Sequence, residues 1–285
     1  MSAVWFEVTL EVPGECSEAV ANFLIEQGSP GLQVQERDDK VCLVAYFSEA
    51  PPREALRRFC TDLGCPVDGG AIRTRQIAEE DWAQNWKLHF RPQLIGDRLC
   101  VCPPWEVATP ADRVAVVIDP GMAFGTGHHA STRGCLSLLD WATRTQCIRR
   151  GLDVGTGSGV LAIAMAKLQV TEVWAVDTDP HALATAKVNA ARNSVEQQID
   201  FALALNDVPG SFDLVTANLY ANLLQELAGE FTRLTGPGGM LICSGLLVDD
   251  EYRVRRTYQR FGFGISRHYE EDGWVTLALR GQAQP

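Results

Sequence analysis

The chain has 285 residues, of which 46% are hydrophobic and 21% charged, and its formal net charge is −11. This length suits about two domains, and the composition is that of a chain folded nearly throughout. The acidic excess argues against a non-specific nucleic-acid binder, which usually carries a basic face. The sequence shows no leader-like start and no apolar run of membrane length. We therefore expect a cytoplasmic protein with no membrane contact and no direct nucleic-acid partner.

The nine cysteines and two adjacent histidines are the candidate metal ligands. The cysteines form no C-x-x-C pair, and a chain of this size needs no disulfides, so we expect reduced thiols. Cys100 and Cys102 lie two apart in an apolar run, where core packing fits better than half a metal site. His128 and His129 are consecutive and point in different directions, which favours structural roles. The sequence therefore predicts no metal site.

The first 78 residues alternate between strand and helix patterns. Apolar side chains at every second position from Val4 to Val12 predict a half-buried strand. Ser17 can cap the helix that follows, and Gly28 can end it. The predicted order is strand, helix, strand, strand, helix and strand, at residues 4–12, 17–28, 32–35, 41–47, 51–64 and 71–77. This order predicts a small ferredoxin-like α+β domain over residues 1–78.

Residues 79–112 contain several prolines and tryptophans and one glycine, and we predict a linker there. In residues 113–285, strand patterns alternate with helix patterns, as in a doubly wound, Rossmann-like α/β domain with a parallel sheet. Its predicted parallel strands cover residues 114–118, 152–154, 172–176, 214–217 and 240–244. Two further strand patterns flank Asp272-Gly273, a pair that suits a tight hairpin turn, so the last strand is expected to be antiparallel.

A glycine-rich turn, Gly155-Thr156-Gly157-Ser158-Gly159, follows a predicted buried strand that ends in Asp153-Val154. Ligands of doubly wound folds bind at this edge of the sheet. Glycine at positions 155 and 157 would let a ligand reach the backbone, and Gly159 would let the next helix pack closely. A turn that serves packing alone is the alternative.

Two polar residues end predicted strands of the same sheet. Asp177 closes the strand after the glycine-rich turn, where a carboxylate can accept hydrogen bonds from both hydroxyls of a ribose. Asp179 with Pro180 fits the N-cap and first residue of a helix instead. Asn218 closes the fourth strand, where its amide could accept from an amine and donate to a cofactor; a helix N-cap is the alternative. Tyr220 fits either the core or the wall of an acceptor pocket.

The spacing D-x-G-x-G-x-G differs from the G-x-G-x-x-G of dinucleotide sites. The chain also offers no second βαβ half of equal size, and its sheet is expected to end in a hairpin. These features resemble class I methyltransferases, in which the turn would pack against the amino-acid and ribose portion of S-adenosylmethionine. A nicotinamide oxidoreductase is the alternative from another class of enzyme, and a binding module without activity is a further one.

The run from Asp119 to Thr132, D-P-G-M-A-F-G-T-G-H-H-A-S-T, gives a more specific resemblance. It resembles the signature ahead of the catalytic domain in the PrmA family, bacterial methyltransferases of the eleventh large-subunit ribosomal protein. The similarity continues through the Gly155 motif, Asp177-Thr178-Asp179-Pro180, Ala217-Asn218-Leu219 and Ser244-Gly245-Leu246-Leu247. It spans most of residues 112–250. The family more often has Asn-Ile-Leu where this chain has Asn218-Leu219-Tyr220.

This resemblance implies an S-adenosylmethionine-dependent enzyme that N-methylates lysine side chains, with N-terminal amines as further acceptors. The implied partner is the eleventh large-subunit protein at the ribosomal stalk base, held by the N-terminal domain. Asn218 is the implied catalytic residue. The implied cofactor contacts are Phe124, Gly125, Thr126, Thr132, Asp153, Gly155, Gly157, Asp177 and Asn218. A class I methyltransferase acting on another protein, a small molecule or RNA is the alternative.

Overall fold

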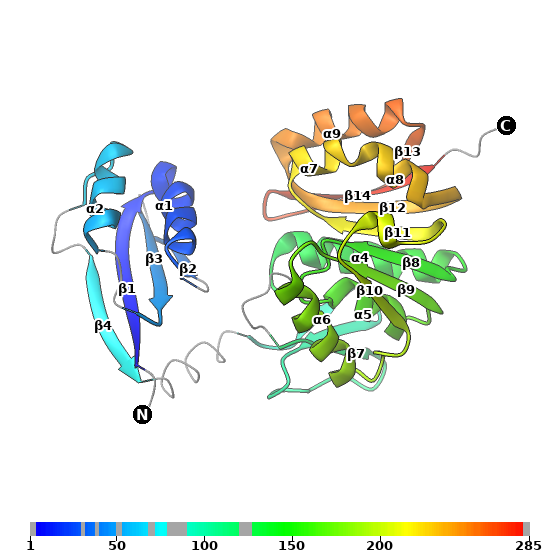
Figure 1. The fold of residues 1–285 in the computed structure, drawn as a ribbon, viewed down its shortest axis with the longest axis horizontal. Coiled ribbons are helices and arrows are strands. Elements are labelled where there is room, and N and C mark those ends of the chain that lie inside the picture. Colours follow the sequence, from blue (N-terminus) through cyan, green and yellow to red (C-terminus); the bar gives the residue numbers. More distant parts are fainter. Residues whose placement is uncertain are drawn as a thin grey trace. The chain divides into compact units, whose positions relative to one another are not determined.

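The computed structural model describes residues 4–29, 32–37, 40–49, 53–67, 72–78, 90–119 and 127–281. The chain divides into two compact units, Met1–His89 and Phe90–Pro285 (Figure 1). No helix within these ranges combines the length and the apolar character that a membrane span requires.

The first unit is a four-stranded antiparallel sheet with two helices packed on one face. The strand order β2-β3-β1-β4 confirms the predicted ferredoxin-like arrangement. Its core joins Leu10, Leu24, Leu43 and Leu56 from two strands and both helices. The first helix begins at Gly14, earlier than predicted. The elements are β1 (Val4–Pro13), α1 (Gly14–Glu26), β2 (Leu32–Arg37), β3 (Lys40–Phe47), α2 (Arg53–Asp62) and β4 (Arg73–Ala78).

The second unit contains a seven-stranded sheet in the order β10-β9-β8-β11-β12-β14-β13. The first five strands of this order run parallel, and β14 is antiparallel to both its neighbours. From β8 the chain runs outward through β9 and β10 and then crosses to β11 on the other side of β8. This path confirms the doubly wound fold. It also creates a topological switch point between β8 and β11. The strands are β8 (Arg150–Val154), β9 (Glu172–Val176), β10 (Ile199–Ala202), β11 (Phe212–Asn218), β12 (Thr235–Leu247), β13 (Phe263–Glu271) and β14 (Trp274–Gly281).

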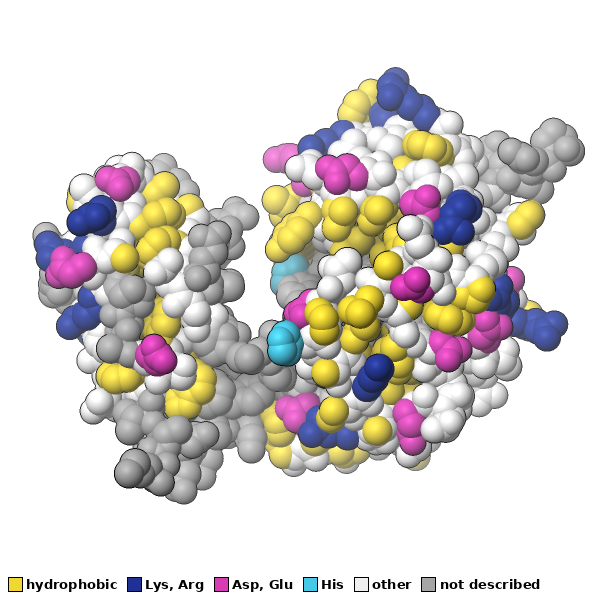
Figure 2. Space-filling model, viewed as in Figure 1, with side chains coloured by type: hydrophobic (Ala, Val, Ile, Leu, Met, Phe, Trp, Pro, Cys, Tyr) yellow, Lys and Arg dark blue, Asp and Glu magenta, His cyan; other side chains and the backbone are white. Residues whose placement is uncertain are grey.

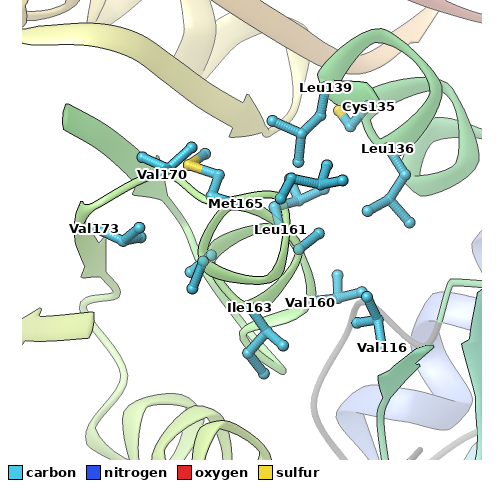
Figure 3. Close-up of a cluster of buried hydrophobic side chains, with 14 of the residues drawn as sticks. Val116, Cys135, Leu136, Leu139, Val160, Leu161, Ile163, Met165, Val170 and Val173 are labelled. Carbon is cyan, nitrogen blue, oxygen red and sulfur yellow. The ribbon is translucent and has the colours of Figure 1, made fainter. Parts of the chain in front are cut away.

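Helices cover both faces of this sheet, and each face has its own buried cluster. Figure 3 shows the cluster that joins α4 to α5, in which Leu136, Leu139, Leu161 and Met165 are buried. The other cluster packs α7, α8 and α9 on the opposite face, around Phe231 and other buried side chains. The helices are α4 (Ala130–Thr145), α5 (Val160–Lys167), α6 (Pro180–Arg192), α7 (Ala221–Glu226), α8 (Ala228–Leu234) and α9 (Val248–Arg260), with a 3-10 turn at Leu205–Asp207.

The turn between β13 and β14 confirms the predicted hairpin. Asp272 and Gly273 have φ values of 51° and 76°. Two consecutive left-handed residues are what a two-residue type I′ turn requires, and its twist matches that of the flanking strands. The seven-stranded sheet therefore ends in an antiparallel pair.

A separate sheet differs from the prediction. The strand β7 (Val114–Val117) was expected in the main sheet, but it pairs in parallel with β6 (Leu99–Cys102), which pairs with β5 (Gln93–Ile95). Residues 93–102 fall within the segment predicted as a linker. The buried carboxylate of Asp140 on α4 holds the turn before β6, accepting from the backbone amide of Asp97 at 2.8 Å and from the Arg98 side chain at 2.6 Å. This part of the predicted linker is ordered structure of the second unit.

Candidate functional site

The glycine-rich turn lies between β8 and α5, at the carboxyl edge of the sheet. Gly155 and Gly157 have φ values of 70° and 53°, a left-handed conformation that favours glycine. The backbone amides of Gly155 and Thr156 donate to the carbonyl of Val176 at 2.8 and 3.0 Å. A Cβ at Gly159 would lie 3.1 Å from Cβ of Ala186, so glycine there lets α5 approach α6. These bonds fix the turn against the end of β9.

Asp177 follows β9 and contacts the same turn directly. Its carboxylate accepts from the Gly157 amide at 2.9 Å and from the Asp179 amide at 3.0 Å. Asp179 accepts in turn from the His181 amide at 2.8 Å, and Pro180 is the first residue of α6. The structure thereby confirms Asp179 as a helix cap and brings Asp177 to the glycine-rich turn.

Asn218 is the last residue of β11, and its side-chain amide donates to the Thr132 hydroxyl at 3.2 Å. Thr132 lies in the first turn of α4 and is 1% exposed. The next residue, Leu219, lies over the glycine-rich turn, because a Cβ at Gly155 would be 2.5 Å from its Cδ2 atom. Asn218, Thr132 and the turn therefore share one edge of the sheet, although 86 residues separate the first two.

Asp153 is buried beneath the turn and is 1% exposed. Its two carboxylate oxygens accept from the hydroxyls of Thr156 and Thr216, each at 2.7 Å. Burial raises the pKa of Asp153 to about 6, the negative charge of Asp177 adds to the rise, and the two hydroxyl bonds oppose it. With both oxygens engaged inside the protein, Asp153 supports the turn that carries Gly155 and Gly157. Sequence reasoning missed Thr216, which the parallel register places opposite Asp153.

Two buried asparagines, one on α6 and one at its C-cap, were also missed. Asn189 donates to the Ser158 carbonyl at 2.9 Å and accepts from the Asp119 amide at 3.2 Å. Asn193 accepts from the Val117 amide at 2.8 Å. They tie the glycine-rich turn to the strand β7 and the residues just after it. Their spacing of four on an otherwise apolar helix face was the available signal. Phe124, Gly125 and Thr126 lie outside the described residues.

His129 and Arg133 have structural contacts at the start of α4. His129 is the N-cap of α4, and its Nδ1 atom lies 2.7 Å from the Ser131 hydroxyl. Burial lowers the pKa of His129, the charge of Arg133 lowers it further, and Asp272 partly opposes this. The Arg133 guanidinium bonds Glu271 at 3.1 Å and Asp272 at 2.8 Å. The geometry agrees with a structural role for His129.

The buried carboxylate predicts a pH-dependent stability. Because the folded-state pKa of Asp153 is about 6 and the ordinary value is 3.8, the folded chain holds this proton more tightly than the unfolded chain. Relative to Asp153→Asn, the wild-type free energy of unfolding should fall between pH 4 and 6, by up to about 3 kcal/mol, and the difference should then stay constant. Urea unfolding of both proteins across this range measures it. A difference independent of pH would contradict the prediction.

The strand order, the glycine-rich turn, Asp177 and Asn218 together define a class I S-adenosylmethionine-dependent methyltransferase. A sequence model of the ribosomal protein L11 methyltransferase (PrmA) family matches residues 4–282. The chain belongs to this family.

Similar proteins agree with this assignment over their whole lengths. A ribosomal protein L11 methyltransferase from Geobacter sulfurreducens is 36% identical, with 99% of this chain and 100% of the relative covered. One from Syntrophotalea carbinolica is 37% identical, with the same coverage. The crystal structure of a ribosomal protein L11 methylase from Lactobacillus delbrueckii subsp. bulgaricus has a TM-score of 0.63 at 29% identity, covering 68% of this chain and 100% of that one.

Proposed function

We propose that this enzyme transfers methyl groups from S-adenosylmethionine to lysine side-chain amines, and to the N-terminal amine, of ribosomal protein L11. The observation that carries the proposal is the Asn218–Thr132 pair, which lies at the same sheet edge as the glycine-rich turn and Asp177. The names of the full-length relatives supply the acceptor protein.

The residues at this edge fit the cofactor. Gly155 and Gly157 expose backbone at the turn because they carry no side chain. Their left-handed φ values disfavour any other residue type at these two positions. The Asp177 oxygens each accept one backbone amide, and a carboxylate oxygen has a second acceptor site that a ribose hydroxyl can use. Thr132 and Asn218 would hold the methionine end together with residues 124–126, and Asp153 would act through the turn.

Adenosylmethionine, when bound, supplies a methyl group on a positively charged sulfonium. The protein must present a neutral amine in line with that methyl group. Neutralising a lysine of pKa about 10.4 at pH 7 costs roughly 4 to 5 kcal/mol, at ~1.36 kcal/mol per unit. Desolvation and the nearby positive charge both lower the amine pKa. The Asn218 amide donates to Thr132, which leaves its oxygen to accept from the amine and orient it.

The first unit serves as the substrate-recognition domain in this proposal. It has its own core, formed by two helices and a four-stranded sheet. We place its action on L11 at the ribosomal stalk base, in the cytoplasm and without direct contact to nucleic acid. The nine cysteines are free thiols, which suits a reducing compartment, and the net charge of −11 disfavours binding to RNA.

Mass spectrometry after incubation with labelled adenosylmethionine tests the acceptor. The assay offers unmethylated ribosomal proteins together, and label should accumulate on L11 lysines and its N-terminus. Label on another ribosomal protein, or on RNA when intact subunits are supplied, would overturn the proposed substrate. Loss of label in Asn218→Ala at saturating adenosylmethionine would support a catalytic role for Asn218 beyond its contact with the cofactor.

The role of Asp177 makes a separate prediction for cofactor affinity. Asp177→Ala should weaken adenosylmethionine binding by roughly 1.5 to 3 kcal/mol, because charge-assisted hydrogen bonds to the ribose are lost. The variant also removes the acceptor of the Gly157 amide, so part of the loss reflects a loosened turn. Asp179→Ala, which removes only the cap of α6, is the matched control. Calorimetry that gives unchanged affinity in a folded Asp177→Ala protein would exclude Asp177 from the cofactor site.

A further inference from the structure

Five large apolar side chains are exposed beside the candidate site. Tyr220 is 80% exposed and Tyr252 72%, and Leu223, Leu247 and Val248 are each more than one-third exposed. Figure 2 shows hydrophobic side chains gathered on the face of the second unit that carries α7. We call these five residues the apolar platform. Exposed apolar groups gathered in this way mark interaction surfaces, and tyrosine is enriched where proteins bind each other.

The platform is built on two helices that are bonded to one another. The Arg253 side chain of α9 donates to the Asn222 side chain of α7 at 2.9 Å. The buried hydroxyl of Tyr258 on α9 donates to the Leu224 carbonyl of α7 at 2.7 Å. These bonds, with the shared buried cluster, hold Tyr220 and Leu223 of α7 at a fixed distance from Tyr252 of α9. A surface of this kind loses little conformational entropy when a partner binds.

The platform continues directly from the catalytic edge. Asn218, the last residue of β11, is the register partner of Ser244 on the parallel strand β12. Tyr220 follows Asn218 by two residues, and Leu247 follows Ser244 by three. Leu219 packs inward over Gly155, so the chain turns Tyr220 outward as the N-cap of α7. A polypeptide that places a side chain at Asn218 would have its neighbouring residues over the platform.

Carboxylates border the platform at the start of α9 and at the tip of the β13–β14 hairpin. The two segments meet, since the Val248 amide donates to the Gly273 carbonyl at 3.2 Å. Arg133, Arg253 and Arg255 form ion pairs within this group, and the Arg256 guanidinium lies 5.9 Å from the centre of the Tyr252 ring. Six carboxylates therefore face four arginines, and negative charge remains in excess. The carboxylates are those of Asp249, Asp250, Glu251, Glu270, Glu271 and Asp272.

We propose that the apolar platform binds the lysine-containing segment of the acceptor protein, with apolar residues flanking the target lysine on Tyr220, Leu223 and Tyr252, and basic residues beside the carboxylates. This inference rests on the proposed function and adds an acceptor-binding surface on the catalytic unit to the one assigned to the first unit. The negative border selects a cationic segment, which is the charge that a lysine-rich acceptor carries.

Steady-state kinetics with L11 as the acceptor test the platform. Tyr252→Ser and Leu223→Ser should each raise the acceptor KM at least fivefold, with kcat changed less than twofold and with wild-type affinity for adenosylmethionine. Phe261→Ser is the matched control, because Phe261 is an exposed aromatic residue at the opposite end of α9. It should leave all three quantities unchanged. Equal KM values for Tyr252→Ser and wild type would overturn the inference and leave the proposed function standing.

Two further measurements test whether the acceptor protein itself contacts the apolar platform and its carboxylates. Asp249→Asn with Glu270→Gln should raise the acceptor KM and weaken its dependence on salt, because fewer charges remain to be screened. A photo-crosslinking residue at position 252 should capture L11, whereas one at position 261 should not. Crosslinking of position 252 to a second copy of the chain would overturn the inference in favour of self-association. A wild-type enzyme that fails to methylate L11 at all would instead remove the proposed function, and this inference with it.

Discussion

Removal of residues 1–89 is expected to abolish methylation of the acceptor protein and to leave adenosylmethionine binding nearly intact. The second unit retains both of its buried clusters and every described residue of the candidate cofactor site, so it should fold without the first unit. The first unit would contribute the larger part of acceptor binding. We expect kcat/KM for L11 to fall at least about 100-fold, which corresponds to ~2.7 kcal/mol of lost binding.

Calorimetry with adenosylmethionine and kinetics with L11 on the same truncated protein measure both effects. The full-length enzyme supplies the reference for each. A truncated protein that binds the cofactor and methylates L11 at the full rate would show that recognition resides in the second unit alone, and the role assigned to the first unit would be wrong.

Gly245→Ala is expected to have the largest effect of any single conservative substitution considered for the site. Gly245 has a φ of 84°, and a Cβ there would lie 2.4 Å from the Leu219 carbonyl oxygen. The obstacle is backbone, so the segment that carries Asn218 and Leu219 must move. Left-handed strain of about 1 to 2 kcal/mol adds to the cost of the clash, and we expect a loss of at least about 3 kcal/mol in the free energy of unfolding. Methyl transfer should fall with it.

Gly262→Ala separates the cost of left-handed backbone strain from the cost of the steric clash. Gly262 has a φ of 81°, but a Cβ there meets no atom within 4 Å, so only the strain of the left-handed backbone remains. Urea unfolding should give a loss of about 1 to 2 kcal/mol for Gly262→Ala. Similar losses in both variants would contradict the proposed clash with Leu219.

The alternation of apolar residues predicted most long elements because their buried faces follow the period of a strand or helix. The first unit was predicted in its complete order, and the Asp272-Gly273 turn was predicted from its residue types. Short elements were predicted poorly. The strand β10 has four residues and went unpredicted, because too few positions repeat to give a pattern. The strand β7 was predicted but assigned to the wrong sheet, since periodicity does not specify a pairing partner.

At the candidate site, local spacing alone predicted the glycine-rich turn, a carboxylate after β9, an amide at the end of β11 and the cap of α6 at Asp179. The contacts between side chains on different strands and helices could not be predicted from this spacing. Thr132 reaches Asn218, Thr216 reaches Asp153, and Asn189 joins Ser158 to Asp119. These contacts depend on strand order and register, which arise from packing of the whole unit, so no local run of residues encodes them.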